Sequence, residues 1–286
     1  YEYTPYRGYM SSVENIAHFG VGSASIIDSV VVTWPNGKKQ VQQRVPVNQT
    51  LTINSKNADR QAAPFVYSSP PGWFTDITAK TGIHFLSSEA DFIDFNIQRL
   101  IPHKLSQYGP PLAAGDVNGD GLQDLLIGGG SPNYATLFIQ KPDGSFYQRK
   151  FTDTTDLKYQ DDAGICLFDA DGDGDLDVYI ASGGSENPPG SKVYADHFYI
   201  NDGKGNFKEY PSAFPINLTA KSCVKAIDFD NDGDLDLFVG GRVLPGSYPS
   251  PVSSYIYRND SKDGKIIFTD VTKEVAPALQ NIGMVS

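Results

Sequence analysis

Three short stretches of the chain place oxygen-bearing side chains at the same spacing. They read GDVNGDGLQDLLIGGG (residues 115–130), FDADGDGDLDVYIASGG (residues 168–184) and IDFDNDGDLDLFVGG (residues 227–241). Counted from the first Asp of each loop, Asp or Asn stands at positions 1, 3, 5 and 9, and Gly stands at position 6. Carboxylates packed this closely repel one another unless a cation lies among them. Calcium suits them well, because it takes about six to eight oxygen ligands in flexible geometry.

The repeated spacing predicts about three structural calcium sites. Gly at position 6 permits a sharp turn, which would direct the backbone carbonyl of position 7 toward the ion. Magnesium fits less well because it keeps its waters, and an acidic turn without metal is a fair alternative for one loop rather than for three. The predicted ligands are Asp116, Asn118, Asp120, Leu122, Asp124, Asp169, Asp171, Asp173, Asp175, Asp177, Asp228, Asp230, Asp232, Asp234 and Asp236.

The loops differ from EF-hands, which carry a bidentate Glu at position 12 and a helix on either side. Position 12 is occupied here by Ile127, Ile180 and Val239. The segments after position 9, LLIG, VYIAS and LFVG, are rich in branched and aromatic residues, which is typical of strands. We therefore expect each loop to join two strands.

Each loop belongs to a longer repeat. Successive units open with FTDIT (residues 74–78), FTDTT (151–155), FKEYP (207–211) and FTDVT (268–272). In the first three units a loop, a glycine-rich exit and an aromatic strand follow, the strands reading TLFIQ, HFYIN and YIYRN. The loops recur at roughly 50 to 60 residues, which suits four short strands per unit, the pattern of a β-propeller blade.

Residues 73–286 resemble FG-GAP/VCBS repeats, the calcium-loop blades also found in the integrin α-subunit propeller. The D-x-D/N-x-D-G-x-x-D core of each loop carries the resemblance. It implies that Asp116, Asn118, Asp120, Asp124 and their counterparts ligate calcium between the first two strands of each blade. The fourth unit stops at Ser286, before its loop, so we expect about 3.5 blades and a propeller truncated in the fourth unit.

An insertion, FIDFNIQRLIPHKLSQYGP (residues 92–110), precedes the first loop. We interpret it as the lead-in to the first calcium blade. His103 and Lys104 lie within it, and they belong either to a binding site or to a packed loop.

Residues 1–54 form a separate unit, in which we predict strands at 29–34, 39–45 and 50–54 and a tight turn at Asn36-Gly37. RGYMSS, HFGVG, IDSVVVTWPNGK and NQTLTI resemble the ASPIC/UnbV domain, a family that brings no assigned chemistry. Residues 55–72 lack a periodic pattern and indicate a linker. The predicted fold class is all-β: a small β-sheet ASPIC/UnbV domain followed by a partial propeller of four-stranded blades.

Composition narrows the classes of partner. The net charge of −11 disfavours nucleic acid and anionic membranes, and no apolar run of transmembrane length occurs. Thirteen of the 34 acidic residues lie in the three loops, so bound calcium would cancel much of the charge locally. Cys166 and Cys223 each precede a loop and form either a disulfide across adjacent repeats or two buried thiols. N-x-S/T triplets, the acceptor motif for N-glycosylation, occur at Asn48, Asn217 and Asn259.

No catalytic constellation stands out, because the loops account for the prominent acids and no nucleophile elbow occurs. We expect a calcium-binding extracellular or cell-surface repeat protein rather than an enzyme, located at the outer membrane or in the periplasm if the source is a Gram-negative bacterium. Its loop face would bind a protein or carbohydrate ligand, as adhesion modules do. The alternative is a scaffold of a carbohydrate-active enzyme such as a lyase, which a cleft with converging acids, or with His and Tyr, would favour. A purely structural spacer is the third interpretation.

Overall fold

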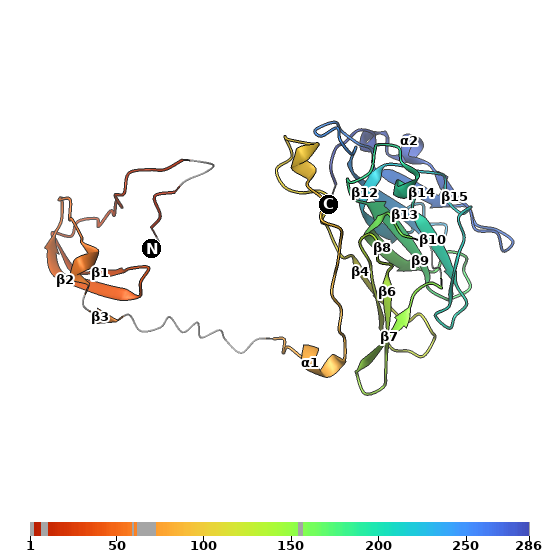
Figure 1. Cartoon of the computed structure of the whole chain (residues 1–286), viewed down its shortest axis with the longest axis horizontal. Helices are drawn as coiled ribbons and strands as arrows, with labels where there is room; N and C mark the ends of the chain where they lie inside the picture. The colour runs from red at the N-terminus through yellow and green to blue at the C-terminus, as the bar shows by residue number, and fades with distance from the viewer. Residues whose placement is uncertain (1–2, 7–10, 59, 62–72, 154–156, 286) are drawn as a thin grey trace. The chain divides into compact units, whose positions relative to one another are not determined.

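The chain divides into two compact units, Tyr1–Thr75 and Asp76–Ser286 (Figure 1). The computed structural model describes residues 3–6, 11–58, 60–61, 73–153 and 157–285. Residues 59 and 62–72 of the predicted linker lie outside this described part, as do residues 7–10 of the RGYMSS motif. None of the helices in the described part has the length and apolar character needed to span a bilayer.

Unit 1 is built on one antiparallel hairpin. β1 (Ile26–Thr33) pairs with β2 (Lys38–Pro46), and the Asn36-Gly37 turn joins them, as predicted. The third strand predicted at residues 50–54 is wrong, because Asn54 instead caps the short helix η1 (Ser55–Asn57) by accepting a hydrogen bond from the Lys56 N–H at 3.0 Å. The strand that completes the sheet is β3 (Arg60–Gln61), which pairs with the start of β2.

In the described residues of unit 2 the strands form three four-stranded antiparallel sheets, called here blades 1, 2 and 3. Within each blade the strands are hydrogen-bonded in chain order, as predicted for propeller blades. The strands are β4 (Leu112–Gly115), β5 (Asp124–Ile127), β6 (Thr136–Gln140), β7 (Phe146–Lys150), β8 (Asp161–Phe168), β9 (Asp177–Gly183), β10 (His197–Asn201), β11 (Phe207–Glu209), β12 (Ala220–Ile227), β13 (Asp236–Val243), β14 (Tyr255–Asn259) and β15 (Phe268–Asp270).

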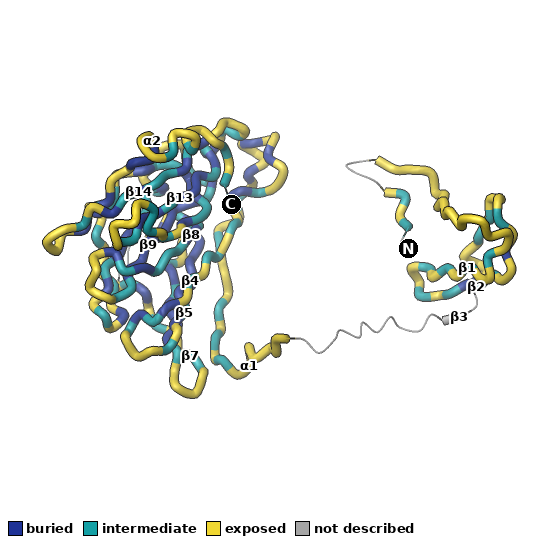
Figure 2. Tube along the Cα trace, turned by 180° about the vertical axis from the view of Figure 1, so that it is seen from behind, coloured by how far each residue is buried: buried dark blue, intermediate teal, exposed yellow. Residues whose placement is uncertain are grey.

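The buried residues of unit 2 lie mainly along the strands of the blades (Figure 2), and apolar side chains of neighbouring blades pack together. Leu126 and Leu137 of blade 1 pack with Val178 and Ile180 of blade 2 in one cluster of buried side chains. A larger aromatic cluster joins blade 2 to blade 3 and includes Tyr179, Phe198, Tyr257 and Phe268. The first strands β4, β8 and β12 contact one another in turn, so the start of each blade lies beside the start of the next.

The repeat units of the sequence are offset from the blades of the structure. Phe207 and Phe268, which open sequence units, begin the last strands β11 and β15 of blades 2 and 3. Phe151 is buried between blades 1 and 2, whereas Phe74 is 94% exposed. The first FTD motif therefore makes no comparable core contact, and the short helix α1 (Thr78–Thr81) follows it.

Equivalent backbone hydrogen bonds link consecutive repeats. The Asp162 N–H of blade 2 donates to the Gly129 carbonyl of blade 1 at 3.1 Å. After α2 (Thr272–Val275) and η4 (Pro277–Leu279), the Val285 N–H donates to the Gly241 carbonyl of blade 3 at 3.0 Å. The described part of the fourth unit therefore begins on blade 3 as blade 2 begins on blade 1, although it forms no sheet of its own.

The insertion at residues 92–110 packs across blades 2 and 3. Ile101 and Leu105 are buried with Tyr194, Ala220 and Val243. The insertion contains η2 (Asp94–Asn96), and Tyr194 ends η3 (Lys192–Tyr194), which leads into β10. The segment predicted as a lead-in to blade 1 thus also covers part of blades 2 and 3.

Candidate metal centres

Each acidic loop joins the first and second strands of its blade. Loop 1 (residues 116–124) follows β4, loop 2 (169–177) follows β8 and loop 3 (228–236) follows β12. Position 6 has a left-handed backbone in all three, with φ of 83° at Gly121, 93° at Gly174 and 102° at Gly233. A side chain would be strained in that conformation, so the glycine is required by the turn.

The Asp at position 9 is buried in every loop and joins the loop to the sheet. One carboxylate oxygen accepts a hydrogen bond from the N–H of loop position 2, and the other accepts from the N–H at the end of the third strand. In loop 2, Asp177 accepts from Ala170 at 3.2 Å and from Asn201 at 2.9 Å. Asp124 and Asp236 make the equivalent pairs at 2.8–3.1 Å. The position-9 carboxylate therefore holds two strands and the loop together before any ion binds.

The Asp at position 1 folds the loop around its own carboxylate. Asp169 accepts from the N–H groups of Gly172 at 2.8 Å and Gly174 at 3.0 Å. Asp116 accepts from four loop N–H groups, which outweigh the effect of its burial and lower its pKa. Such local hydrogen bonds are typical of Asp in turns. Asp116 is thus held in its ionised form in loop 1.

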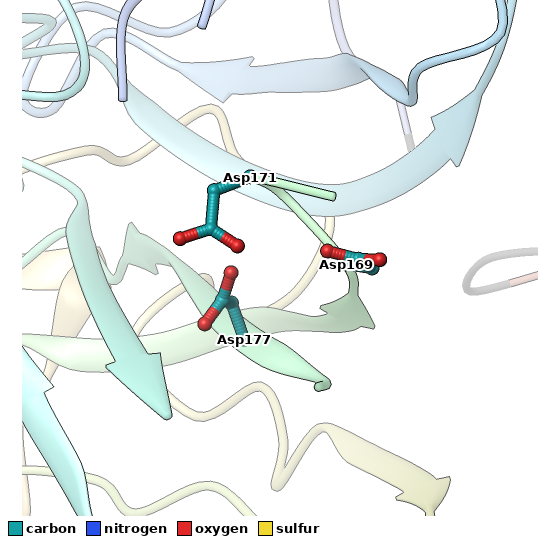
Figure 3. A group of neighbouring side chains, drawn as sticks. All are labelled: Asp169, Asp171 and Asp177. Atoms are coloured by element: carbon teal, nitrogen blue, oxygen red, sulfur yellow. The ribbon is translucent and has the colours of Figure 1, made fainter. Parts of the chain in front are cut away.

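In loops 2 and 3 the carboxylates of positions 1, 3 and 9 converge. Asp169, Asp171 and Asp177 each bring one oxygen within 4.8 Å of the others, and Asp228, Asp230 and Asp236 do the same. Figure 3 shows the Asp171 and Asp177 carboxylates facing one another with Asp169 beside them. Burial, followed by the charges of the neighbouring acids, raises the pKa of Asp177 to about 7. These clusters therefore favour a bound proton or a bound cation.

Two family models match the sequence. The FG-GAP-like repeat matches residues 116–180 and again residues 169–239. Each match begins at one acidic loop and ends in the strand that follows the next acidic loop. The chain contains FG-GAP-like repeats. The second model, described as ASPIC and UnbV, matches residues 1–60, so this domain precedes the repeats as the sequence motifs implied. The comparison with curated proteins found no match.

The FG-GAP loops fit calcium by an observation independent of the carboxylate spacing. In loop 3 the Oδ1 atoms of Asp228 and Asp234 are buried and accept no hydrogen bond from the described residues. Burial, and then the charges of neighbouring acids, raises the pKa of Asp234 to about 6. Buried oxygens without a partner are costly unless a cation or donor satisfies them. Loop 3 would therefore hold calcium through Asp228, Asp230 and Asp236, and loop 2, whose carboxylates converge in the same way, through Asp169, Asp171 and Asp177.

Loop 1 differs because its position 3 is neutral. The Asn118 amide donates to Asp120 at 3.1 Å, and its oxygen accepts from the Asp120 N–H at 3.1 Å. Among the described residues, loop 1 forms no cluster of three acids like those of loops 2 and 3. It therefore supplies less negative charge than the other two FG-GAP loops.

The predicted ligands at positions 5 and 7 lie outside the three-carboxylate clusters. Asp120, Asp173 and Asp232 at position 5 are exposed. Each accepts a hydrogen bond from the N–H of position 7, which is Leu122 at 2.9 Å, Asp175 at 2.9 Å or Asp234 at 3.2 Å. In this structure these two positions brace the loop, and their assignment as ligands stays a prediction.

Sequence reasoning missed the amide residues that end the third strands. Asn201 donates to the Val117 carbonyl of loop 1 at 2.8 Å and to the Leu176 carbonyl of loop 2 at 3.1 Å. Asn259 connects loops 2 and 3 in the same way, through the Ala170 carbonyl at 3.0 Å and the Leu235 carbonyl at 3.3 Å. The available signal was the terminal Asn of HFYIN and YIYRN. These residues tie loop 1 to blade 2 and loop 2 to blade 3.

The structure also shows the state of the two cysteines and the surroundings of two of the three N-x-S/T triplets. Cys166 and Cys223 are free thiols, and burial raises the pKa of Cys166, which packs against the aromatic core. The side chains of Asn217 and Asn259 are used inside the fold, where Asn217 donates to the Tyr257 hydroxyl at 2.9 Å. Both residues are buried, so the triplets at Asn217 and Asn259 do not present the asparagine amide at the surface, where N-glycosylation would modify it.

Proposed function

We propose that this FG-GAP repeat protein binds calcium in structural loops and acts outside the cytoplasm as a protein- or glycan-binding module. The convergence of positions 1, 3 and 9 in loops 2 and 3 carries the proposal. Loops of this kind suit the millimolar calcium found at the cell surface, in the periplasm or in the extracellular space. Calcium would fix the loops and thereby the blades that present the binding face.

Calcium-dependent capture of a partner tests this function. The full chain would be applied to glycan and protein arrays with calcium and again with a chelator. We expect a partner to be retained in calcium and lost in the chelator. An Asp177→Asn/Asp236→Asn double variant should bind less calcium and retain less partner, whereas an Asp143→Asn variant in the exposed β6–β7 turn should behave as the parent. Arrays that retain nothing in either condition would contradict the proposal.

A carbohydrate-active enzyme such as a lyase is the second candidate, and one observation favours it. The Tyr108 hydroxyl is hydrogen-bonded to the His103 imidazole, and the Arg242 guanidinium stacks on the Tyr108 ring at 3.6 Å. A lyase removes the proton next to a uronate carboxylate, forms a carbon–carbon double bond and breaks the glycosidic C–O bond, whose oxygen takes up a proton. His or Tyr would serve as the base, and Arg would hold the carboxylate.

Ultraviolet absorbance of the unsaturated product tests the lyase candidate. The full chain would be incubated with uronate-containing polysaccharides in calcium. Product formation that is lost in His103→Ala and kept in His84→Ala, an exposed histidine elsewhere in the unit, would support it. Absence of product with every polysaccharide would rule against it and leave the binding function standing.

A further inference from the structure

A cavity of about 240 Å³ opens at the ends of the strands opposite to the calcium loops. Asp161 begins β8, Ser222 lies near the start of β12 and Arg242 lies near the end of β13. The loops 169–177 and 228–236 follow the far ends of β8 and β12. The cavity is therefore separate from the metal centres.

The insertion forms a fixed wall of this cavity. Tyr108 and Pro110 of the insertion line it, together with the neighbouring Pro111. The insertion is anchored by Asp94, a buried residue whose carboxylate accepts hydrogen bonds from the hydroxyls of Ser106 and Ser185. These anchors reach blade 2, so the cavity is formed before a ligand arrives, as most small-molecule sites are.

Arg242 offers hydrogen-bond donors to this space. Its guanidinium stacks on the Tyr108 ring at 3.6 Å, which fixes its plane. The Nε atom is buried, and no described residue accepts a hydrogen bond from it. Because Arg242 lines the cavity and its guanidinium carries further N–H groups, a ligand there can accept hydrogen bonds from it.

The acidic group of the cavity lining is Asp161, and the Glu186 carboxyl lies beside it next to Gly184. Asp161 and Glu186 are hydrogen-bonded to each other, and the Asp161 carboxylate also accepts from the Ser131 N–H at 2.8 Å. Burial raises the pKa of both, and the charge of Asp161 contributes to raising that of Glu186 to about 8. The pair therefore retains a proton near neutral pH and can both donate and accept hydrogen bonds.

The two nearby ammonium groups are already satisfied. Lys158 pairs with Asp162 at 2.7 Å and donates to the Gly129 carbonyl at 2.7 Å. Lys221 pairs with Asp196 at 3.0 Å. Among the residues that line the cavity, the charges left for a ligand are thus one guanidinium and one carboxylate, which balance.

We propose that this cavity binds one neutral monosaccharide ring at the end of a glycan, an inference that rests on the proposed binding function and names its ligand. Sugar hydroxyls donate to the Asp161 carboxylate and accept from Arg242, while Leu105, Pro111 and Ala163 contact the C–H faces of the ring. The volume lies below the roughly 300–1,000 Å³ of sites for drug-sized ligands, so it suits a single ring.

The chemistry of the lining favours a neutral ligand and binding over hydrolysis. The carboxyl pair and the net charge of −11 repel an acidic sugar, and Arg242 repels a cationic one. Carboxyls that cleave glycosides stand roughly 5–9.5 Å apart, whereas Asp161 and Glu186 are directly hydrogen-bonded. The pair is therefore arranged to hold hydroxyls rather than to flank a scissile bond.

Ligand-observed NMR on the full chain in calcium tests the site. The probes are glucose, galactose, mannose, fucose, rhamnose and N-acetylglucosamine, with glucuronic acid as the acidic comparison. We expect at least one neutral sugar to bind more tightly than glucuronic acid. Arg242→Ala and Asp161→Asn should each weaken its binding about tenfold, the loss expected when a buried polar partner is removed. Arg242→Lys should recover part of the affinity, because it keeps the charge without the planar fork.

Lys208→Ala provides the control, since Lys208 is an exposed cation on β11 and is not among the residues that line the cavity. It should bind the sugar as the parent does, and every variant must keep the parental melting temperature and calcium titration. Binding of a neutral sugar that Arg242→Ala and Asp161→Asn leave unchanged would overturn the site while keeping the glycan-binding function. A protein partner on the arrays with no NMR response from any sugar would overturn the sugar site and keep the binding module. No partner on any array would remove both.

Discussion

At the scale of single residues, the acids of the loops have different tasks. The position-9 aspartates are buried and hold backbone N–H groups from two parts of the blade. The position-5 aspartates are exposed and brace only the next turn of the loop. Aspartates of the same loop therefore contribute unequally to folding, and the contribution depends on their position in the loop.

Replacing Asp177 with Ala should destabilise the protein even in the absence of calcium. The change leaves the N–H groups of Ala170 and Asn201 buried without an acceptor. At roughly 1–3 kcal/mol for each of the two groups, we expect a loss of about 2–6 kcal/mol in the free energy of unfolding. Urea unfolding in a chelator measures it, with Asp173→Ala as the control that should lose less than about 1 kcal/mol. Equal losses in the two variants would refute the separate tasks.

Replacing Glu186 with Gln should flatten the pH dependence of stability. Burial, and then Asp161, raises the folded-state pKa of Glu186 from 4.5 to about 8. The folded chain therefore binds this proton more tightly than the unfolded chain, and stability from the group falls as pH rises through that window. Gln stays neutral and still donates to Asp161, so the variant should lose less melting temperature between about pH 5 and pH 9.

Saturating calcium would keep the metal loops from titrating during this measurement. The other titratable groups around the pair, Glu89, Asp162, Lys158 and Tyr194, are present in parent and variant alike. The exposed Glu274→Gln on α2 provides the control and should leave the slope unchanged. A Glu186→Gln variant with the parental slope would show that the carboxyl pair does not share a proton as inferred.

At the scale of elements, loops 1 and 2 are each held by the third strand of their own blade and by an asparagine amide from the next blade. Asn201 ends β10 in blade 2 and hydrogen-bonds loop 1 of blade 1. Its oxygen accepts from the Gly205 N–H at 3.1 Å and so also fixes the β10–β11 turn. Ordering of one loop is therefore transmitted to the next blade.

Replacing Asn201 with Ala should weaken calcium binding in loop 1 and stability together. It removes the donor to the Val117 and Leu176 carbonyls, and we expect a loss of about 1–3 kcal/mol in stability. Calorimetric titration and urea unfolding would measure the two effects. Asn206→Ala, an exposed residue in the same turn, is the control. An unchanged calcium titration in Asn201→Ala would exclude coupling between loop and blade.

The sequence predicted the loops and the strands after them because both signals are local. The Asp spacing marks each loop, and the branched residues after position 9 mark the strand. The task of Asn201 could not be predicted, because its partner Val117 lies 84 residues away. The cavity combines β8, β12, β13 and the insertion, so only the fold brings Asp161 and Arg242 to the same space. The strand predicted at residues 50–54 failed because a cap at Asn54 outweighed β propensity.

At the scale of the whole molecule, the acidity is concentrated at one end of the blades. Thirteen of 34 acidic residues lie in the three acidic loops, and loops 2 and 3 carry more charge than loop 1. Affinity for calcium rises with the number of charged ligands. Calcium should therefore occupy loops 2 and 3 at lower concentrations than loop 1.

Calcium titration by calorimetry on chelator-stripped protein should show two tighter sites and one weaker site. Asn118→Asp restores the missing carboxylate of loop 1 and should tighten the weak site severalfold. Gln123→Glu adds the same charge at an exposed, non-ligand position of the loop and controls for long-range attraction. Three equal sites, or equal gains in both variants, would refute the dependence on ligand charge.

The hydrogen bonds of the position-9 aspartates also give a rule for comparing blades. Because Asp124, Asp177 and Asp236 secure backbone groups whether or not an ion is present, loss of the other loop acids would abolish metal affinity and spare the sheet. A repeat that keeps only its last Asp should then be an apo blade that still folds. A repeat that keeps the first acids and lacks the last should be the rarer and less stable form, since its ion would have to replace two backbone anchors.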